Sequence, residues 1–128
     1  MSPIRVLIAD NSKDFAEMLS DTIQISSDIE IVGIAENGPQ TITLLNQTKP
    51  DVLLLDIVMP DIDGLEVLRR INKVFDDEIP AIFMISALGN EEITELAISL
   101  GARYFFTKPI NLKALISKIR EVKGKTEK

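Results

Sequence analysis

Short apolar runs and segments with helical periodicity alternate along the whole chain, and this alternation limits the folds that it can adopt. Five runs rich in β-branched, leucine and aromatic residues predict strands, at 4–9, 29–35, 51–55, 81–86 and 102–107. Apolar residues three or four positions apart follow each run and predict a helix after each strand. Residues with the usual features of helix ends agree with this order, namely the N-cap candidates Asn90 and Asn111 and the terminating Gly101.

Strands that are apolar throughout, each followed by a helix, need a parallel sheet with helices on both faces. We therefore expect an α/β fold, a (βα)5 doubly wound, flavodoxin-like sheet with the strand order 2-1-3-4-5. A chain of 128 residues is the size of one domain. We place that domain at residues 1–122 and interpret the polar stretch 123–128 as a tail or the start of a linker.

The composition excludes several classes of function. With 20 Asp and Glu against 14 Lys and Arg, the net charge of -6 argues against direct binding of nucleic acid. Because the chain has no Cys and no His, any metal must be held by oxygen atoms, which favours Mg²⁺ or Mn²⁺. No apolar run approaches the roughly 18 residues that span a bilayer, and the start lacks signal-peptide features. We expect a cytoplasmic protein with no membrane contact.

Polar residues stand at the carboxyl ends of four predicted strands: Asp10, Asp56, Ser86 and Lys108. In the order 2-1-3-4-5 these ends meet at one edge of the sheet, and Asp10 and Asp56 lie on adjacent strands, roughly 4.8 Å apart. Two close carboxylates repel each other unless a cation lies between them, which predicts a Mg²⁺ site. Lys108 adds a positive charge and Ser86 a hydroxyl donor, as a phosphoryl group requires. The pattern predicts Asp56 to be a nucleophile that attacks phosphorus.

Four motifs, in this order, resemble the receiver domain of two-component response regulators: IAD at 8–10, LLLDIVMPDIDG at 53–64, ISA at 85–87 and FFTKP at 105–109. The resemblance covers nearly the whole chain. Within the family, the sequences of these motifs are most similar to those of receivers of sporulation initiation transcription factors. It implies a signalling switch that takes a phosphoryl group from a histidine kinase or phosphotransfer protein, in a phosphorelay that regulates transcription. It also implies self-phosphotransfer and autodephosphorylation only, and not an enzyme acting on a separate substrate.

The resemblance assigns roles to individual residues of the site. Asp56 is the phosphoacceptor, and Asp10, Asp56 and the carbonyl of Val58 hold the metal ion. Ser86 and Lys108 bind the incoming phosphoryl group.

The resemblance also implies how phosphorylation is transmitted. Movement of Ser86 and Lys108 is coupled to an aromatic residue three positions before the lysine, which is Phe105, and the bond between Lys108 and Pro109 is usually cis. The output face then consists of the fourth helix, fifth strand and fifth helix. Through this face the domain would control a DNA-binding output domain outside this chain or another partner, and it would form a homodimer on phosphorylation.

Asn11 departs from the family pattern, which usually has an acid here as the direct metal ligand. An amide oxygen can ligate only as a neutral group, so we expect weaker Mg²⁺ binding. Asn just before a helix is also a good N-cap, and both roles stay open. Because of Asn11, a pseudo-receiver that acts as an interaction module without phosphorylation is the alternative. Val58 and Leu88 are apolar where some receivers position an attacking water, which predicts slow loss of the phosphoryl group.

Two other classes share part of the pattern. A flavodoxin-like carrier of FMN needs a neutral phosphate loop rich in donors, whereas the DNSKD loop at 10–14 is acidic and has no glycine. A phosphatase of the haloacid dehalogenase type needs its nucleophile after the first strand and a second Asp two places later, where this chain has Ser12.

Overall fold

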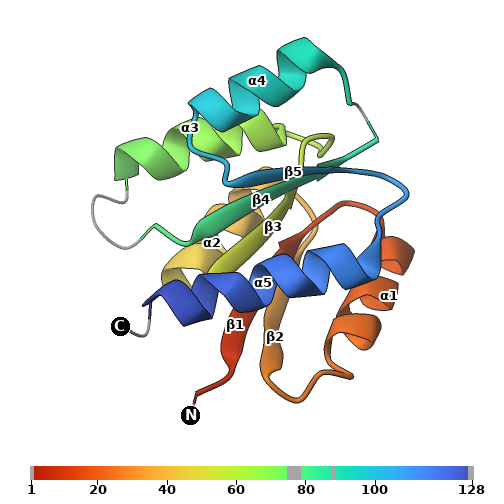
Figure 1. Ribbon diagram of the computed structural model, residues 1–128. Helices are drawn as coiled ribbons and strands as arrows, with labels where there is room; N and C mark the ends of the chain where they lie inside the picture. The colour runs from red at the N-terminus through yellow and green to blue at the C-terminus, as the bar shows by residue number, and fades with distance from the viewer. Residues whose placement is uncertain (1, 75–78, 88, 127–128) are drawn as a thin grey trace.

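The computed structural model describes residues 2–74, 79–87 and 89–126, in which strands and helices alternate as predicted (Figure 1). All neighbouring strands are parallel, and the five-stranded sheet has the order β2-β1-β3-β4-β5. The predicted doubly wound fold is therefore confirmed. The elements are β1 (Ile4–Ala9), α1 (Lys13–Ile23), β2 (Ile29–Ala35), α2 (Gly38–Thr48), β3 (Val52–Asp56), α3 (Gly64–Val74), β4 (Ala81–Ser86), α4 (Glu91–Ser99), β5 (Tyr104–Thr107) and α5 (Leu112–Thr126).

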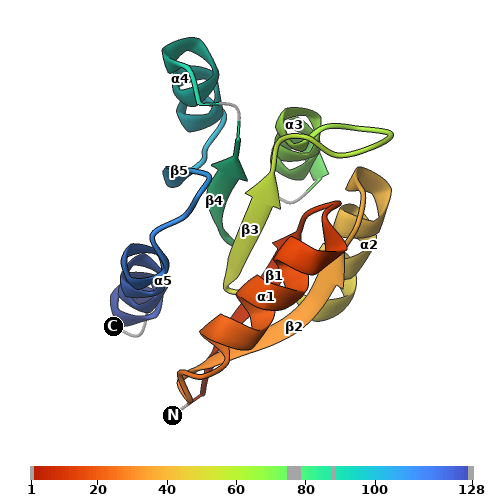
Figure 2. The ribbon, with the colours of Figure 1, turned by 90° about the vertical axis from the view of Figure 1, so that its right-hand side faces the viewer.

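Both faces of the sheet are buried, which is why its central strands β1, β3 and β4 are mostly apolar. Successive side chains of a strand point to opposite faces, so Leu53 and Leu55 pack on one face of β3 while Val52 and Leu54 pack on the other. Apolar residues of α2, α3 and α4 cover the first face, and those of α1 and α5 cover the second (Figure 2). The two layers hold the sheet rigidly and leave its carboxyl edge to carry the loops.

The predicted helix signals act at the predicted places. The side chain of Asn90 accepts a hydrogen bond from the N–H of Ile93 at 2.8 Å, and that of Asn111 accepts one from the N–H of Ala114 at 3.1 Å. Gly101 follows α4 with a φ of +107°, a backbone conformation that favours glycine. These residues fix where α4 and α5 begin and where the chain turns towards β5.

The third strand is shifted by one residue from the predicted range 51–55. Asp51 lies outside it, because its carboxylate accepts the N–H of Arg5 at 2.9 Å and so ties the loop to β1. Asp56 is instead the last residue of β3. Pairing in the sheet therefore fixes the backbone of Asp56, and its carboxyl group projects from a strand and not from a loop.

The fifth strand begins later than the predicted range 102–107, at Tyr104. The N–H of Ala102 donates to the carbonyl of Ala97 at 3.0 Å, so Ala102 closes the end of α4 and does not pair in the sheet. The apolar pattern could not separate these two roles, since Ala102 is buried in both.

Two further differences from the sequence pattern concern the helices. The last helix continues to Thr126, so it enters the stretch predicted to be a tail; the predicted domain boundary stays a prediction. Met18 and Leu96 lie among the regularly spaced apolar residues of α1 and α4, and both are exposed. Among the described residues, no helix combines the length and apolar character needed to cross a membrane.

Candidate functional site

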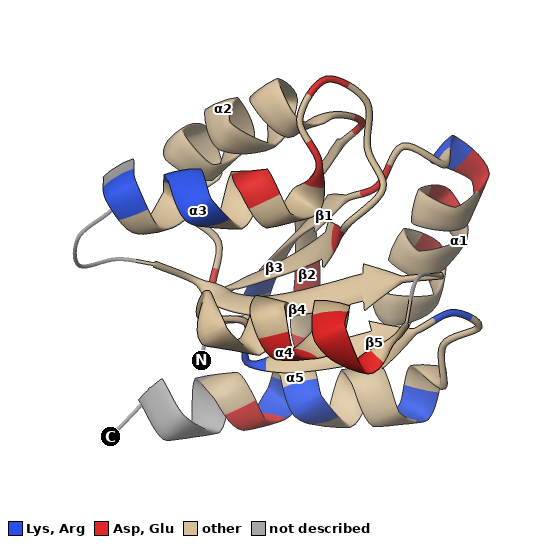
Figure 3. Cartoon of the chain, turned by 90° about the horizontal axis from the view of Figure 1, so that it is seen from above, with Lys and Arg blue, Asp and Glu red and all other residues tan. Residues whose placement is uncertain are grey.

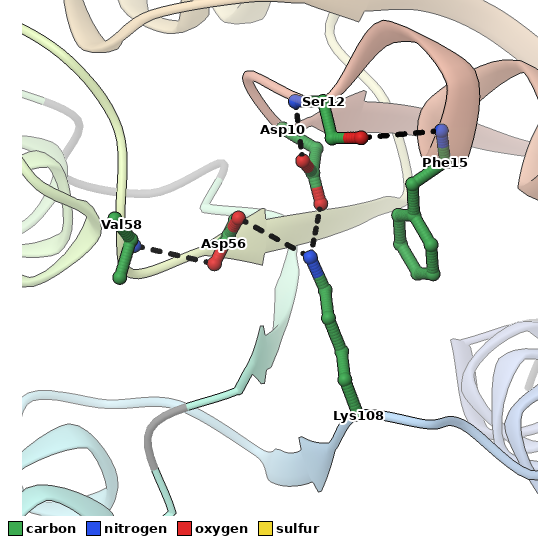
Figure 4. Close-up of polar contacts among 6 residues, drawn as sticks. All are labelled: Asp10, Ser12, Phe15, Asp56, Val58 and Lys108. Atoms are coloured by element: carbon green, nitrogen blue, oxygen red, sulfur yellow. Dashed lines mark hydrogen bonds and ion pairs between the residues drawn. The ribbon is translucent and has the colours of Figure 1, made fainter.

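The carboxyl ends of β1, β3 and β5 bring Asp10, Asp56 and Lys108 together (Figure 4). Pairing of β1 with β3 sets Ala9 beside Leu55, so the residues that follow each of them are neighbours. The Nζ atom of Lys108 lies 3.0 Å from Oδ2 of Asp10 and 3.5 Å from Oδ2 of Asp56. The carboxylates are 3% and 5% exposed and the lysine is 22% exposed, so one ammonium at the mouth of the site faces two buried acids.

The environment of Asp56 opposes its ionisation. Burial raises the pKa of Asp56, and the nearby charge of Asp10 raises it further. The ammonium of Lys108 and a hydrogen bond from the N–H of Val58, at 3.2 Å to Oδ1, act in the opposite direction but do not cancel the rise in pKa. The site consequently lacks positive charge, and an added cation would stabilise its two carboxylates.

The loop after β1 orients Asp10. Its Oδ1 atom accepts the N–H of Ser12 at 2.8 Å, and Oγ of Ser12 in turn accepts the N–H of Phe15 at 3.4 Å as the N-cap of α1. The Phe15 ring lies beside the lysine, with 4.2 Å between its centroid and Nζ of Lys108. Sequence reasoning missed both residues. An Asp two places before a Ser at a helix start was a usable signal for Ser12, whereas Phe15 only looked like part of an apolar stripe.

Asn11 does not cap α1, so the N-cap interpretation of this residue is wrong. Ser12 stands one residue closer to the helix and accepts the hydrogen bond that a cap must accept. Asn11 itself is exposed beside Asp10. Its role as a metal ligand stays a prediction, and the described residues contain no group of three acidic side chains that could hold an ion without further donors.

The loop after β3 places the backbone close to the acids. The N–H of Gly64 donates to the carbonyl of Ile57 at 2.7 Å, and a Cβ atom on Gly64 would collide with the carbonyl oxygen of Asp56. Val58 is 50% exposed, so the backbone of this residue serves the site while its side chain faces solvent. Seen from above, acidic segments gather on the loops at this edge (Figure 3).

The remaining predicted residues lie on β4 and β5. Ser86 ends β4 and is fully buried, and its carbonyl accepts the N–H of Lys108 at 2.9 Å. Phe105 pairs with Met84 across the sheet and is half-buried against the apolar cluster under α3 and α4. The peptide bond between Lys108 and Pro109 is cis, as the resemblance implied. Beside Lys108 runs an apolar groove of about 500 Å³.

The family model of the response regulator receiver domain matches residues 6–120. The chain belongs to this family. Among solved structures, it is 34% identical to the response regulator domain of CheB from Thermotoga maritima, with a TM-score of 0.85 over 94% of this chain and 96% of that one. The signal receiver domain of NarL from Mycobacterium tuberculosis gives 26% identity and a TM-score of 0.89, over 97% of this chain and 99% of that one.

A third solved structure is a complex of CheX and CheY with BeF₃ and Mg²⁺ from Borrelia burgdorferi. The chain described here is 29% identical to the matched chain of that complex, with a TM-score of 0.84 over 94% of its own length and 90% of the matched chain. The family assignment places the chain in two-component signalling, where receiver domains work with kinases and output domains. It favours the receiver over the FMN carrier and the phosphatase.

Proposed function

We propose that this receiver domain accepts a phosphoryl group on Asp56 from a histidine kinase or a phosphotransfer protein, in a reaction that depends on Mg²⁺ or Mn²⁺. The observation that carries the proposal is the contact of the Lys108 ammonium with the buried carboxylates of Asp10 and Asp56. Three charged groups from distant parts of the chain meet there at the carboxyl edge of a parallel sheet, where ligands of such folds bind.

The bonds that form and break in the proposed transfer involve only groups of the site and the donor. A carboxylate oxygen of Asp56 attacks phosphorus, an O–P bond forms, and the P–N bond to the donor imidazole breaks with its electron pair returning to nitrogen. Lys108 stays protonated and donates to the phosphoryl oxygens, and Ser86 supplies a hydroxyl at the adjacent strand end. In autodephosphorylation, water attacks phosphorus, the P–O bond to Asp56 breaks with its electron pair returning to the carboxylate, and inorganic phosphate leaves with the protons of the water. The domain thus turns over only its own phosphoryl group and is not an enzyme for a separate substrate.

The donor set suits a hard divalent cation. Asp10 and Asp56 are buried oxygen donors that repel each other, and we propose that they hold the ion together with the carbonyl of Val58. When bound, the ion would supply positive charge to the phosphoryl oxygens. Asn11 would contribute at most a neutral amide oxygen, so we expect the affinity for the ion to be low.

The proposal is tested by the intact mass of the protein after incubation with acetyl phosphate, with and without Mg²⁺. In this assay the P–O bond to the acetyl group breaks and acetate leaves. We expect one phosphoryl gain that requires Mg²⁺ and is absent in Asp56→Ala and Asp56→Asn. A gain that persists in both variants would refute Asp56 as the acceptor.

The same assay separates the receiver from the pseudo-receiver. No gain at any Mg²⁺ concentration would leave an interaction module without phosphorylation. If Asn11→Asp then restored the gain, the defect would lie in that one amide.

We further propose that phosphorylation acts through Phe105 on the face formed by α4, β5 and α5. Through this face the domain would control a DNA-binding output domain or another partner, and it would form a homodimer on phosphorylation. We place it in a cytoplasmic phosphorelay that governs sporulation. Only the amino-acid sequences of the motifs support the link to sporulation. Sedimentation before and after full phosphorylation tests the dimer, and an unchanged sedimentation coefficient would remove it.

A further inference from the structure

We propose that Phe15 is a positioning residue for Lys108, whose ammonium it holds beside the acid pair through a cation–π contact. The inference rests on the proposed phosphorylation of Asp56, because it is there that Lys108 meets the phosphoryl group. None of the motifs that carry the receiver resemblance includes position 15.

The geometry around the ammonium carries the proposal. Lys108 Nζ lies 3.0 Å from Asp10 and 3.5 Å from Asp56, and its distance to the ring centroid of Phe15 is 4.2 Å (Figure 4). A cation within about 6 Å of an aromatic centroid is attracted by the negative face of the ring. The two carboxylates and the ring thus offer the ammonium three attractive neighbours.

The ring is held in place by the residues that orient Asp10. Asp10 accepts the N–H of Ser12, Ser12 accepts the N–H of Phe15, the ring of Phe15 contacts Lys108, and Lys108 donates to Asp10. The four residues therefore form a closed circuit between the start of α1 and the end of β5. Any shift of α1 relative to the sheet moves both an acid and the ring.

The physical need for such a contact follows from the side chain of Lys108. It is a flexible chain, and the side chain as a whole is 22% exposed. Two carboxylates on one side would still allow the ammonium to swing towards solvent. The ring attracts the charge without accepting a conventional hydrogen bond, so the ammonium stays near the acids and keeps donors that can turn to phosphoryl oxygens.

A bland role is also available, because Phe15 lines the apolar groove beside Met18 and Leu112. In that role only the size of the side chain matters. The test must therefore change the electrons of the ring without changing its shape.

We would replace Phe15 by phenylalanines with one, two and three fluorine atoms, which progressively weaken the negative face of the ring. At saturating Mg²⁺, the rate of phosphorylation by acetyl phosphate should fall stepwise, about tenfold in total, which corresponds to a typical cation–π contact of about 1.4 kcal/mol. Phe15→Leu should lie at the low end, and Phe15→Tyr should restore the rate. The same fluorine series at Phe106, which belongs to an aromatic cluster on β4 and β5, is the matched control and should leave the rate unchanged.

A second readout does not depend on phosphorylation. The ring current of Phe15 should shift the ε-CH₂ protons of Lys108 upfield in the NMR spectrum of the protein, and Phe15→Leu should abolish this shift. If the wild-type protein takes no phosphoryl group, the proposed function fails while the shift still reports on the contact. A rate that is flat across the fluorine series, or that falls equally in the Phe106 series, would overturn the positioning role even if the shift is present.

Discussion

Two features of Asp56 oppose its ionisation in the unliganded protein: the residue is buried, and it lies beside a second acid. Both raise its pKa, and the folded state therefore binds its proton more tightly than the unfolded chain does. A group of this kind stabilises the fold at pH values below its unfolded pKa, and that contribution is lost as the pH rises through the folded pKa. The receiver thus gives up stability at neutral pH to keep a nucleophile in a site that excludes much of the solvent.

Asp56→Asn should accordingly be more stable than the wild-type protein at pH 7 in the absence of metal. The amide fills the same volume, carries no charge, and leaves the ion pair of Asp10 with Lys108 in place. The difference should shrink towards zero as the pH falls below the unfolded pKa of Asp56. Urea unfolding in EDTA at pH 7 and at acidic pH measures it, and a difference that grows with acidity would contradict the sign of the pKa shift.

Asn11→Asp should tighten Mg²⁺ binding by at least about tenfold, because it adds a full negative charge next to a hard cation. Calorimetric titration with Mg²⁺ alone measures the affinity. Asn46→Asp, on the exposed side of α2, makes the same change of charge away from the site and is the control. Equal gains in the two variants would mean that only the net charge of the protein matters.

The sequence was sufficient to find Asp10, Asp56 and Lys108, since each follows or ends an apolar strand and the strand order brings those ends together. It was insufficient for Phe15, whose contact with Lys108 depends on how α1 meets the loop after β5. Two segments so distant in sequence approach each other only through packing, and no local pattern records it. The N-cap of α1 was predicted at the wrong residue for a simpler reason, because adjacent Asn and Ser residues are almost equally good caps.

The junction between β3 and α3 leaves no room for a side chain at Gly64. The chain returns so closely over Asp56 at Gly64 that only glycine fits, as an added Cβ would meet backbone atoms that cannot turn away. Gly33 is less confined: a Cβ atom there would lie 3.3 Å from the Cδ1 methyl group of Leu7, a tight contact that a small shift of this side chain would relieve.

Gly64→Ala should therefore lower the free energy of unfolding by about 1–3 kcal/mol, as overpacking does, and should reduce phosphorylation by displacing Asp56. Gly33→Ala should cost less than about 1 kcal/mol and leave phosphorylation intact. Urea unfolding and the acetyl phosphate assay measure the two effects. Equal losses in both variants would show that backbone freedom, and not the contact with Asp56, decides the outcome.

Element types and order were predictable, because buried parallel strands are apolar throughout and amphipathic helices are not. Element ends were less predictable. Whether β3 starts at residue 51 or 52 depends on a carboxylate that bonds to a neighbouring strand, and whether Ala102 belongs to a helix end or a strand depends on where its N–H points. The first end is decided by a partner that is distant in the sequence, and the second by the direction of the backbone.

As a whole, the molecule should hold its phosphoryl group for minutes or longer. Val58 exposes an apolar side chain next to Asp56, so it offers no polar group to orient an attacking water. Leu88, the other apolar position in this prediction, lies outside the described residues. Loss of the phosphoryl mass over time measures the lifetime, and Val58→Asn should shorten it several-fold; complete loss within seconds in the wild-type protein would contradict the prediction.

The strand order also determines when during synthesis the protein becomes competent. Lys108 stands 98 residues after Asp10 and 52 after Asp56. A nascent chain still on the ribosome can expose its acceptor carboxylate long before the lysine has left the exit tunnel, and any proteolytic fragment that ends before β5 lacks the ammonium altogether. Because parallel pairing of distant strands is slow compared with local folding, receptivity to a signal arises only after β5 and Lys108 have been synthesised and have left the ribosome.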